Sequence, residues 1–415
     1  MKRSYYIVAL IMLVFFVISF LTNIIGPLIP DIINGFSLSL TLVAVLPFAF
    51  FIAYGVMSIP SGMLIEKYNE KKIMIAAFVV SLIGSVMLAV YPNYLSAVFS
   101  LFLIGCGMAM LQVVINPLLR TAGGEEHYAF FSILAQLIFG LASFISPMVY
   151  SSIVSKLNAH DESSVIISAL AKHTPGNLPW ISMYWVFAVI IVLMIIVLIF
   201  TRFPKVELNT DEKPGALKVH LLLFKNRVVI LFFIALLCYV GTEQGVANWI
   251  SQFLLTYHQY DPQKTGADTV AYFWGLMTAG GVLGLLLVKL MDSRKVLIIF
   301  TVLAILSLSV ALFGSGKMAL IAFPMVGFFA SVMYPIIFSL ALNSVNEHHG
   351  SFSGILVTGI VGGAIVPLII GWLGDHLGLR TGMCFLYLTM GFILSIGFWA
   401  KPIIQNKTIS LGKKE

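Results

Sequence analysis

Long apolar runs, separated by short polar or charged segments, repeat along the whole 415-residue chain. An apolar run of about 18 residues or more can cross a hydrocarbon core about 30 Å thick as a helix. Helices are the expected spanning element, because backbone in lipid must satisfy its own hydrogen bonds. The runs predict twelve helices, at residues 5–29, 41–64, 73–91, 95–118, 129–153, 180–201, 228–255, 269–290, 296–314, 318–343, 352–373 and 381–400.

The first run is longer than the apolar region of a signal peptide, and no small-residue cleavage site precedes Asp31. We therefore expect it to be retained as the first span. The longest polar and basic stretch, residues 202–227, separates six predicted helices from six. It is expected to be a cytoplasmic linker between two six-helix bundles, at residues 1–201 and 228–415. The expected fold class is an all-α membrane protein with twelve transmembrane helices. The loop at residues 155–180 carries a short amphipathic stretch and is expected to be a surface cap.

Composition supports the membrane assignment, because 60% of residues are hydrophobic and only 10% are charged, against about 25% charged in soluble domains. The three cysteines, Cys106, Cys238 and Cys384, each lie inside an apolar run without metal-type spacing. We expect small buried hydrophobes there, and neither a metal site nor a cofactor. The chain has no GxxxxGK[ST] loop, so ATP is not expected as a direct energy source.

The net charge of +7 follows the predicted topology. With both termini in the cytoplasm, most of the 24 lysines and arginines fall on the cytoplasmic side. The basic residues left on the opposite side are Lys156, Lys172, Lys264, Lys317 and Arg380. The positive-inside rule thus predicts a multi-pass bacterial inner-membrane protein with cytoplasmic termini. The basic charge needs no nucleic-acid partner.

A motif follows the second predicted helix, where residues 62–72 read GMLIEKYNEKK. Gly62 is expected to let two helices approach closely. Glu66 can cap a helix N-terminus or pair with the basic cluster.

This segment resembles the signature of the major facilitator superfamily, G-x-L-x-D-[RK]-x-G-x-[RK]-[RK], which lies between the second and third helices. Glu66 stands at the usual Asp and Asn69 at the usual Gly. The glycine position of the signature implies a tight turn, which is expected at Asn69 because asparagine tolerates the left-handed conformation. A looser echo at residues 291–295 follows the eighth predicted helix. The resemblance implies two bundles related by pseudo-twofold symmetry, with a central site near the midplane and transport by alternating access. It also implies a gating role, and the candidate gating residues are Gly62, Glu66, Lys67, Lys71 and Lys72.

Further segments resemble the fucose:proton symporter family, which also holds glucose/galactose and N-acetylglucosamine permeases. They are LQVVINP at residues 111–117, LAQ at 134–136, YVGTEQGVANW at 239–249, and the stretch at 333–367. They occur in order on the expected helices and cover both halves.

The sequence also departs from that family. The carboxylate of the fucose branch in span one falls on Gly26, and the acidic residue of span four falls on Gln112, as in the glucose/galactose branch. The family's asparagines in spans five and ten fall on Phe139 and Ala330, and the arginine of span eight on Gly281. Substrate identity and proton coupling therefore do not transfer from the resemblance.

Glu243 lies near the middle of the seventh predicted span and is the most costly polar residue in the spans. A carboxylate there normally faces a cavity or a partner. Glu243 is therefore a candidate proton carrier or a hydrogen-bond acceptor for the solute. The competing interpretation is a structural carboxylate bonded to a neighbouring helix.

Carboxamides form a stripe beside Glu243, since Gln244, Asn248 and Gln252 recur every four residues and Trp249 is adjacent. Such a stripe with an aromatic platform suits a polyhydroxylated ligand. Hydrogen bonding between helices is the competing interpretation.

Polar residues in the first half supply further candidates. Gln112 and Asn116 share a face of span four, and Gln136 lies in span five with Ser132 and Ser143 on the same side. Asn23 in span one is a further candidate. The complete set of predicted substrate-binding residues is Gln112, Asn116, Gln136, Gln244, Asn248, Trp249 and Asn23.

These features predict a secondary transporter for a small polar solute, a sugar or sugar derivative, with a proton as candidate coupling ion. The expected partners are the solute and the bilayer, and the expected state is a monomer. An exporter of apolar compounds on the same fold is the alternative, and it predicts a cavity lined by aromatics. A membrane enzyme is disfavoured, because the spans carry no nucleophile, paired carboxylates or His cluster. The solute, the direction of transport and the coupling ion stay open.

Overall fold

The computed structural model describes residues 5–124, 127–161, 164–203, 223, 225–345 and 349–403. Within these ranges, 12 helical segments are long and apolar enough to cross a membrane. This number confirms the prediction from the apolar runs.

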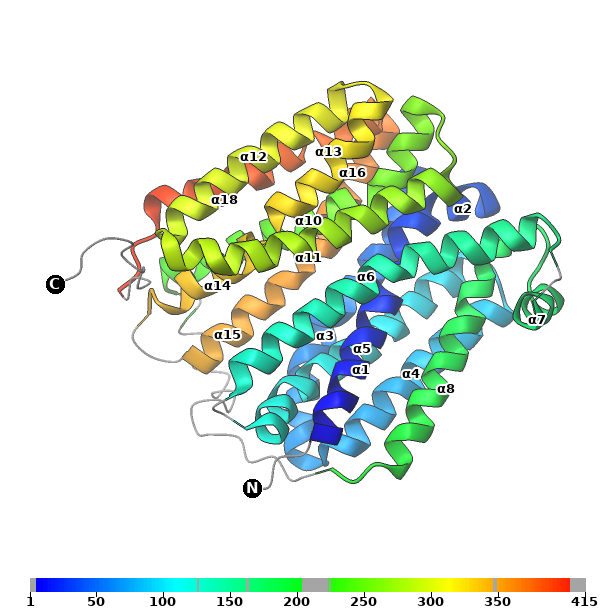
Figure 1. Ribbon diagram of the computed structural model, residues 1–415, viewed down its shortest axis with the longest axis horizontal. Coiled ribbons are helices and arrows are strands. Elements are labelled where there is room, and N and C mark those ends of the chain that lie inside the picture. The colour runs from blue at the N-terminus through cyan, green and yellow to red at the C-terminus, as the bar shows by residue number, and fades with distance from the viewer. Residues whose placement is uncertain are drawn as a thin grey trace. The chain divides into compact units, whose positions relative to one another are not determined.

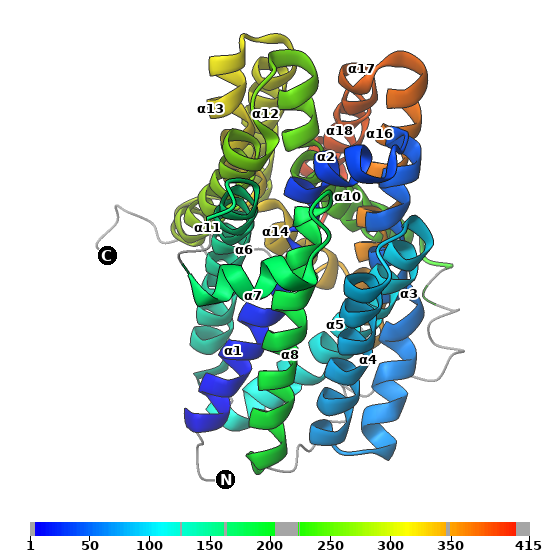
Figure 2. The same cartoon turned by 90° about the vertical axis from the view of Figure 1, so that its right-hand side faces the viewer.

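The first six spans are formed as follows (Figures 1 and 2): α1 (Tyr5–Thr22) with α2 (Ile25–Phe36), α3 (Leu40–Lys67), α4 (Glu70–Val90), α5 (Tyr94–Gly123), α6 (Tyr128–Asn158), and η2 (Pro179–Ile181) with α8 (Ser182–Phe200). The short amphipathic stretch predicted between spans five and six is α7 (Val165–His173), which buries Ile167 and Leu170. Helix α5 packs against α3 and α4, α4 against α8, and α1 against α6.

The last six spans are α10 (Arg227–His258), a single π-helical turn η4 (Pro262–Gly266) with α11 (Ala267–Leu290), α12 (Ser293–Phe313), α13 (Gly316–Ala330) with α14 (Met333–Leu342), α15 (His349–Thr358) with η5 (Gly359–Val361) and α16 (Gly362–Leu377), and α17 (Leu379–Met383) with α18 (Leu386–Trp399). Helix α12 packs against α13 and α18, and α16 packs against α17.

The chain forms two compact units, residues 1–208 with 248–271, and residues 209–247 with 272–415. The segment 248–271 clusters with the first unit because η4 packs on α2 and α6. Most of the predicted linker, residues 204–222 and 224, lies outside the described residues. The expected bundle borders at residues 201 and 228 stay a prediction.

Two spans break four residues before a proline. Helix α1 gives way to α2 at Asn23 and Ile24, and α13 gives way to α14 at Ser331 and Val332. A proline has no N–H for the carbonyl four residues earlier, so Pro27 and Pro335 leave the carbonyls of Asn23 and Ser331 without their usual helical partner. Each break places irregular backbone in the middle of a span.

The first span is longer than the sequence predicts. The prediction ends it at residue 29, but α2 continues to Phe36, where Ser37 takes a left-handed conformation (φ 51°) and its N–H bonds to the oxygen of Ile33. Asp31 therefore lies within the span. Its carboxylate does not end the helix because neighbouring side chains donate hydrogen bonds to it.

The close helix approach expected at Gly62 is wrong, because a Cβ there would meet no described atom within 4 Å. The close approaches lie elsewhere in the same half. A Cβ on Gly105 would collide with the backbone of Phe50, and one on Gly107 would collide with Ser81 and with the backbone of Ala77. Small residues on α5 thus set the spacing to α3 and α4.

The cysteines follow the expectation in part. Cys106 and Cys238 are buried, whereas Cys384 is partly exposed, and all three carry free thiols.

Candidate functional site

Glu243 lies in the middle of α10, where two neutral groups donate hydrogen bonds to it. Tyr239 donates from its hydroxyl to Oε2 at 2.7 Å, and Gln244 donates from Nε2 to Oε1 at 3.1 Å. Tyr239 stands four residues before Glu243, so both side chains lie on one face of the helix. A carboxylate held by neutral donors can take up a proton without breaking an ion pair.

Aromatic rings continue from this carboxylate within the second unit. The Tyr239 ring lies 5.7 Å from that of Tyr334, which stacks on Phe338 at 5.8 Å. Tyr334 and Phe338 belong to α14, directly after the break in the tenth span. The rings of Tyr239, Tyr334 and Phe338 therefore form an apolar surface beside the Glu243 carboxylate.

The predicted carboxamide stripe lies on one helix, as expected, and most of it is buried. Gln244 and Asn248 are 5% and 3% exposed, and Trp249 is fully buried. Gln252 donates from Nε2 to the hydroxyl of Thr256 at 3.1 Å. Buried Nδ2 of Asn248 and Oε1 of Gln252 have no hydrogen-bond partner among the described residues. An unpaired buried polar atom is costly, so these two groups retain hydrogen-bonding capacity.

The candidates on α5 and α6 are more accessible. Asn116 and Gln136 are exposed and Gln112 is half-buried. Asn116 Nδ2 donates to the backbone oxygen of Gln112 at 3.3 Å, so the two residues do share a helix face. The side-chain amides of Gln112 and Gln136 can therefore meet a polar solute.

Asn23 has a different environment from the other candidates. Its Nδ2 donates to the hydroxyl of Ser143 at 2.8 Å and to that of Ser19 at 3.3 Å. The hydroxyls of Ser19 and Ser143 lie 2.6 Å apart. Asn23 is 5% exposed and lies at the break of the first span. These contacts tie α1 to α6, which favours a role for Asn23 in helix packing.

Residues of the predicted gating segment cap the ends of two helices. Lys71 donates from Nζ to the backbone oxygens of Ile199 at 2.6 Å and Thr201 at 2.8 Å, which caps the end of α8. The left-handed turn expected at Asn69 is wrong, because its φ is −74° and its side chain instead caps α4 by accepting from Lys72 N. Lys72 has an exposed side chain. The side chains of Glu66 and Lys67 lie outside the described residues.

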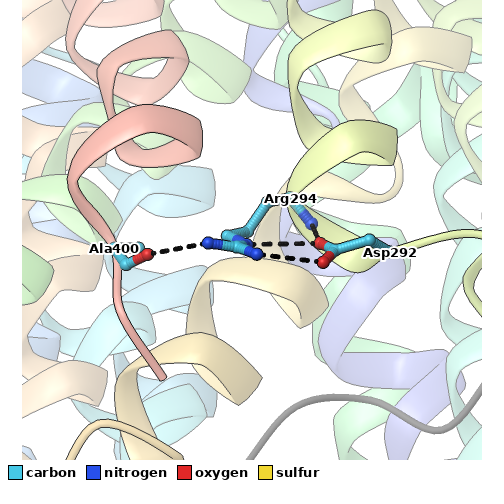
Figure 3. Close-up of polar contacts among 3 residues, drawn as sticks. All are labelled: Asp292, Arg294 and Ala400. Carbon is cyan, nitrogen blue, oxygen red and sulfur yellow. Dashed lines mark hydrogen bonds and ion pairs between the residues drawn. The ribbon is translucent and has the colours of Figure 1, made fainter. Parts of the chain in front are cut away.

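The second half repeats this arrangement at the echo of the motif (Figure 3). Asp292 caps α12 by accepting from Arg294 N at 2.8 Å. The Arg294 guanidinium pairs with Asp292 at 3.1 Å and donates to the oxygen of Ala400 at 3.4 Å. The side-chain hydrogen bond from Arg294 is the main cause that lowers the pKa of Asp292, with its backbone N–H and the charges of Arg294 and Lys295 acting in the same direction against partial burial.

A family model described as Major Facilitator Superfamily matches residues 11–367. The chain belongs to this superfamily of transporters. The glucose/galactose transporter of Brucella abortus biovar 1 (strain 9-941) is 30% identical over 394 residues, which cover 91% of this chain and 90% of the relative. The L-fucose-proton symporter of Escherichia coli (strain K12) is 26% identical over 400 residues, which cover 91% and 89%.

A solved structure supports the same fold. A single-residue variant of the E. coli fucose:proton symporter matches with a TM-score of 0.67 at 24% identity, covering 96% of this chain and 100% of that chain. The major facilitator fold and the resemblance to the fucose and glucose/galactose branch are thus confirmed by the relatives and this structure together. The relatives are transporters and not enzymes.

The sequence analysis did not predict two groups of polar contacts in this protein, one at Glu243 and one at Asp31. Tyr239 is the partner of Glu243, and its spacing of four residues along a helix was the available signal. Asp31 is the second, with partners Tyr150 and Gln263. A carboxylate inside the apolar run PLIPDII was its signal, but its partners lie far away in sequence.

Proposed function

We propose that this chain is a sugar transporter that carries a small hydroxylated solute across a bacterial inner membrane by alternating access. The observation that carries the proposal is the match to sugar transporters over about nine tenths of both chains. The bundles at residues 1–201 and 228–415 are the two halves that rock against each other. The chain acts as a monomer with both termini in the cytoplasm.

The polar groups of each unit support a hydroxylated solute. In the first unit, Gln112, Asn116 and Gln136 offer accessible carboxamides, and Asn248 has an unpaired amide nitrogen. In the second unit, Glu243 and Gln244 lie beside the Tyr239 and Tyr334 rings. Amides and carboxylates discriminate hydroxyl groups well, because a solute without them leaves buried polar groups unpaired. An exporter of apolar compounds is disfavoured, because its site would be lined mainly by aromatic and aliphatic side chains.

Glu243 is the proposed proton carrier of this transporter. The chain has no carboxylate at Gly26 or Gln112, the positions used by the fucose branch. The neutral donors Tyr239 and Gln244 can bond either form of the Glu243 carboxyl group, since a tyrosine hydroxyl both donates and accepts.

The test is ligand-dependent stabilisation of the purified protein with hexoses, deoxyhexoses, amino sugars and sugar acids. A ligand that binds only the folded state raises the apparent stability. Sugars that stabilise the protein should also be taken up by proteoliposomes that contain it. Stabilisation by lipophilic cations and by no sugar would contradict the proposal. Reporter fusions at the C-terminus test its cytoplasmic location.

A further inference from the structure

One carboxylate outside the proposed solute site joins three elements of the first compact unit. Asp31 on α2 accepts a hydrogen bond at 2.5 Å from the hydroxyl of Tyr150 on α6. It also accepts from Nε2 of Gln263 on η4, at 3.0 and 3.2 Å to its two oxygens. Gln263 Oε1 in turn accepts from Nδ2 of Asn158 at 2.8 Å. We call these four residues, Asp31, Tyr150, Asn158 and Gln263, the Asp31 network.

The Asp31 network is buried at its centre and accessible to water at its edge. Tyr150 is fully buried, so water does not compete for its hydrogen bond to Asp31. Asn158, by contrast, is exposed, and Gln263 is half-buried. Water can therefore replace the bonds of Gln263 when η4 moves away, whereas the buried Tyr150 hydroxyl fixes the orientation of the Asp31 carboxylate that receives Gln263.

The Gln263 end is anchored firmly to the seventh span. Asp261 caps the turn by accepting from the backbone N–H of Gln263 at 2.8 Å. The Ser251 hydroxyl on α10 donates to the oxygen of Pro262 at 3.2 Å, and a Cβ on Gly266 would collide with Ser251. A displacement of the end of α10 must therefore carry Gln263 with it.

The connected segments come from opposite halves of the sequence. Asp31, Tyr150 and Asn158 belong to spans one and five, whereas η4 begins span eight, and Gln263 lies 232 residues from Asp31. Alternating access requires the two halves to separate at each end in turn. A directional polar link between them is a suitable latch, because it defines one closed arrangement and its groups can be hydrated when it opens.

We propose that the Asp31 network is a latch that holds η4 against α2 and α6 and must break in each transport cycle. This proposal rests on the alternating-access transport proposed above. Gln263 is the moving part, and Asp31 with Tyr150 is its fixed receptor. Removing the Gln263 amide weakens the closed arrangement and makes the open one more populated.

The test uses one pair of reporter positions that leaves the network intact. Lys156 on α6 and Lys264 on η4 are exposed neighbours of Asn158 and Gln263. Both become cysteine in a background in which Cys106, Cys238 and Cys384 are alanine. Spin labels on the pair report the distance between α6 and η4 by pulsed electron resonance without any solute.

The latch predicts a dominant short-distance population in the labelled parent. Gln263→Ala and Tyr150→Phe should each shift part of it to longer distances. Tyr94→Phe is the matched control, because the Tyr94 hydroxyl bonds to Leu42 O within the first half, and it should leave the distribution unchanged. An unchanged distribution in both Gln263→Ala and Tyr150→Phe overturns the proposal.

The same cysteine pair tests whether the latch must open. A cleavable thiol cross-linker that joins residues 156 and 264 should lower uptake at least tenfold, and cleavage should restore it. Each single-cysteine variant treated with the reagent is the control. Full uptake by completely cross-linked protein overturns the latch. If the untreated parent takes up no sugar, the proposed substrate class fails instead, and the distance measurement still decides the latch.

Discussion

Arg294 donates a hydrogen bond from Nη1 to the backbone oxygen of Ala400 at 3.4 Å, and so fastens the start of α12 to the end of α18 (Figure 3). Lys71 makes the corresponding contact in the first half, with the oxygen of Thr201 at 2.8 Å at the end of α8. In each half, a basic residue at the start of the third span therefore caps the sixth. A cation near unpaired carbonyls at a helix C-terminus is favourable both as a donor and through the helix dipole.

This relationship predicts that Lys71→Ala lowers the stability of the folded protein by about 0.3–1 kcal/mol, the usual contribution of a charge at a helix end. The measurement is the apparent midpoint of thermal unfolding in detergent. Lys72→Ala is the matched control, because the neighbouring side chain is exposed. Equal effects of the two substitutions would contradict a specific cap by Lys71.

Asp292 predicts a pH dependence of stability. Hydrogen bonds from Arg294 lower its pKa in the folded protein below the ordinary value of 3.8. A lowered pKa means that the unfolded chain takes up the proton first, so the stabilisation is complete above about pH 4 and is lost as the pH falls through the folded-state pKa. The unfolding midpoints of the parent and of Asp292→Asn should therefore differ by a constant amount at neutral pH and converge in strong acid. A difference that grows on acidification would contradict this assignment.

Glu243→Gln is expected to abolish uphill accumulation of solute in energised proteoliposomes while exchange down a gradient continues. A neutral amide can hydrogen-bond the solute and Tyr239 but cannot release a proton. Glu70→Gln is the control, because Glu70 lies in the first turn of α4 and is not part of the α10 stripe. Unchanged accumulation in Glu243→Gln would remove this residue from proton coupling.

The two asparagines of the predicted site should respond differently to alanine substitution. Asn248→Ala should weaken solute binding by about 1–3 kcal/mol, as should Gln112→Ala and Asn116→Ala, because each removes a polar partner of the solute. Asn248→Ala should not lower the stability of the unliganded protein, since Asn248 Nδ2 has no described hydrogen-bond partner to lose.

Asn23→Ala should do the reverse and destabilise the unliganded protein by about 1–3 kcal/mol, because Ser143 and Ser19 lose a buried donor. Thermal unfolding with and without solute separates the two effects. A stability loss for Asn248→Ala as large as that for Asn23→Ala would assign both residues to helix packing.

The number of spans, the helical class and the superfamily can all be predicted from the order of the residues. Lipid offers no hydrogen bonds, so each span must be an apolar helix. Such a helix can be recognised in the sequence from its composition and length. Pairs at four-residue spacing are equally legible, since the α-helix alone places Gln112 beside Asn116 and Tyr239 beside Glu243.

The partners of the polar groups and the points where helices touch depend on the folded arrangement. Pro27 and Pro335 break their spans, whereas Pro117 and Pro147 lie inside unbroken α5 and α6. Gly62 has open space, although its motif predicts a close contact. Asp31 meets Gln263 across 232 residues of chain, and no local pattern encodes such a meeting. Local periodicity follows from backbone geometry, but side-chain partners follow from how distant helices pack.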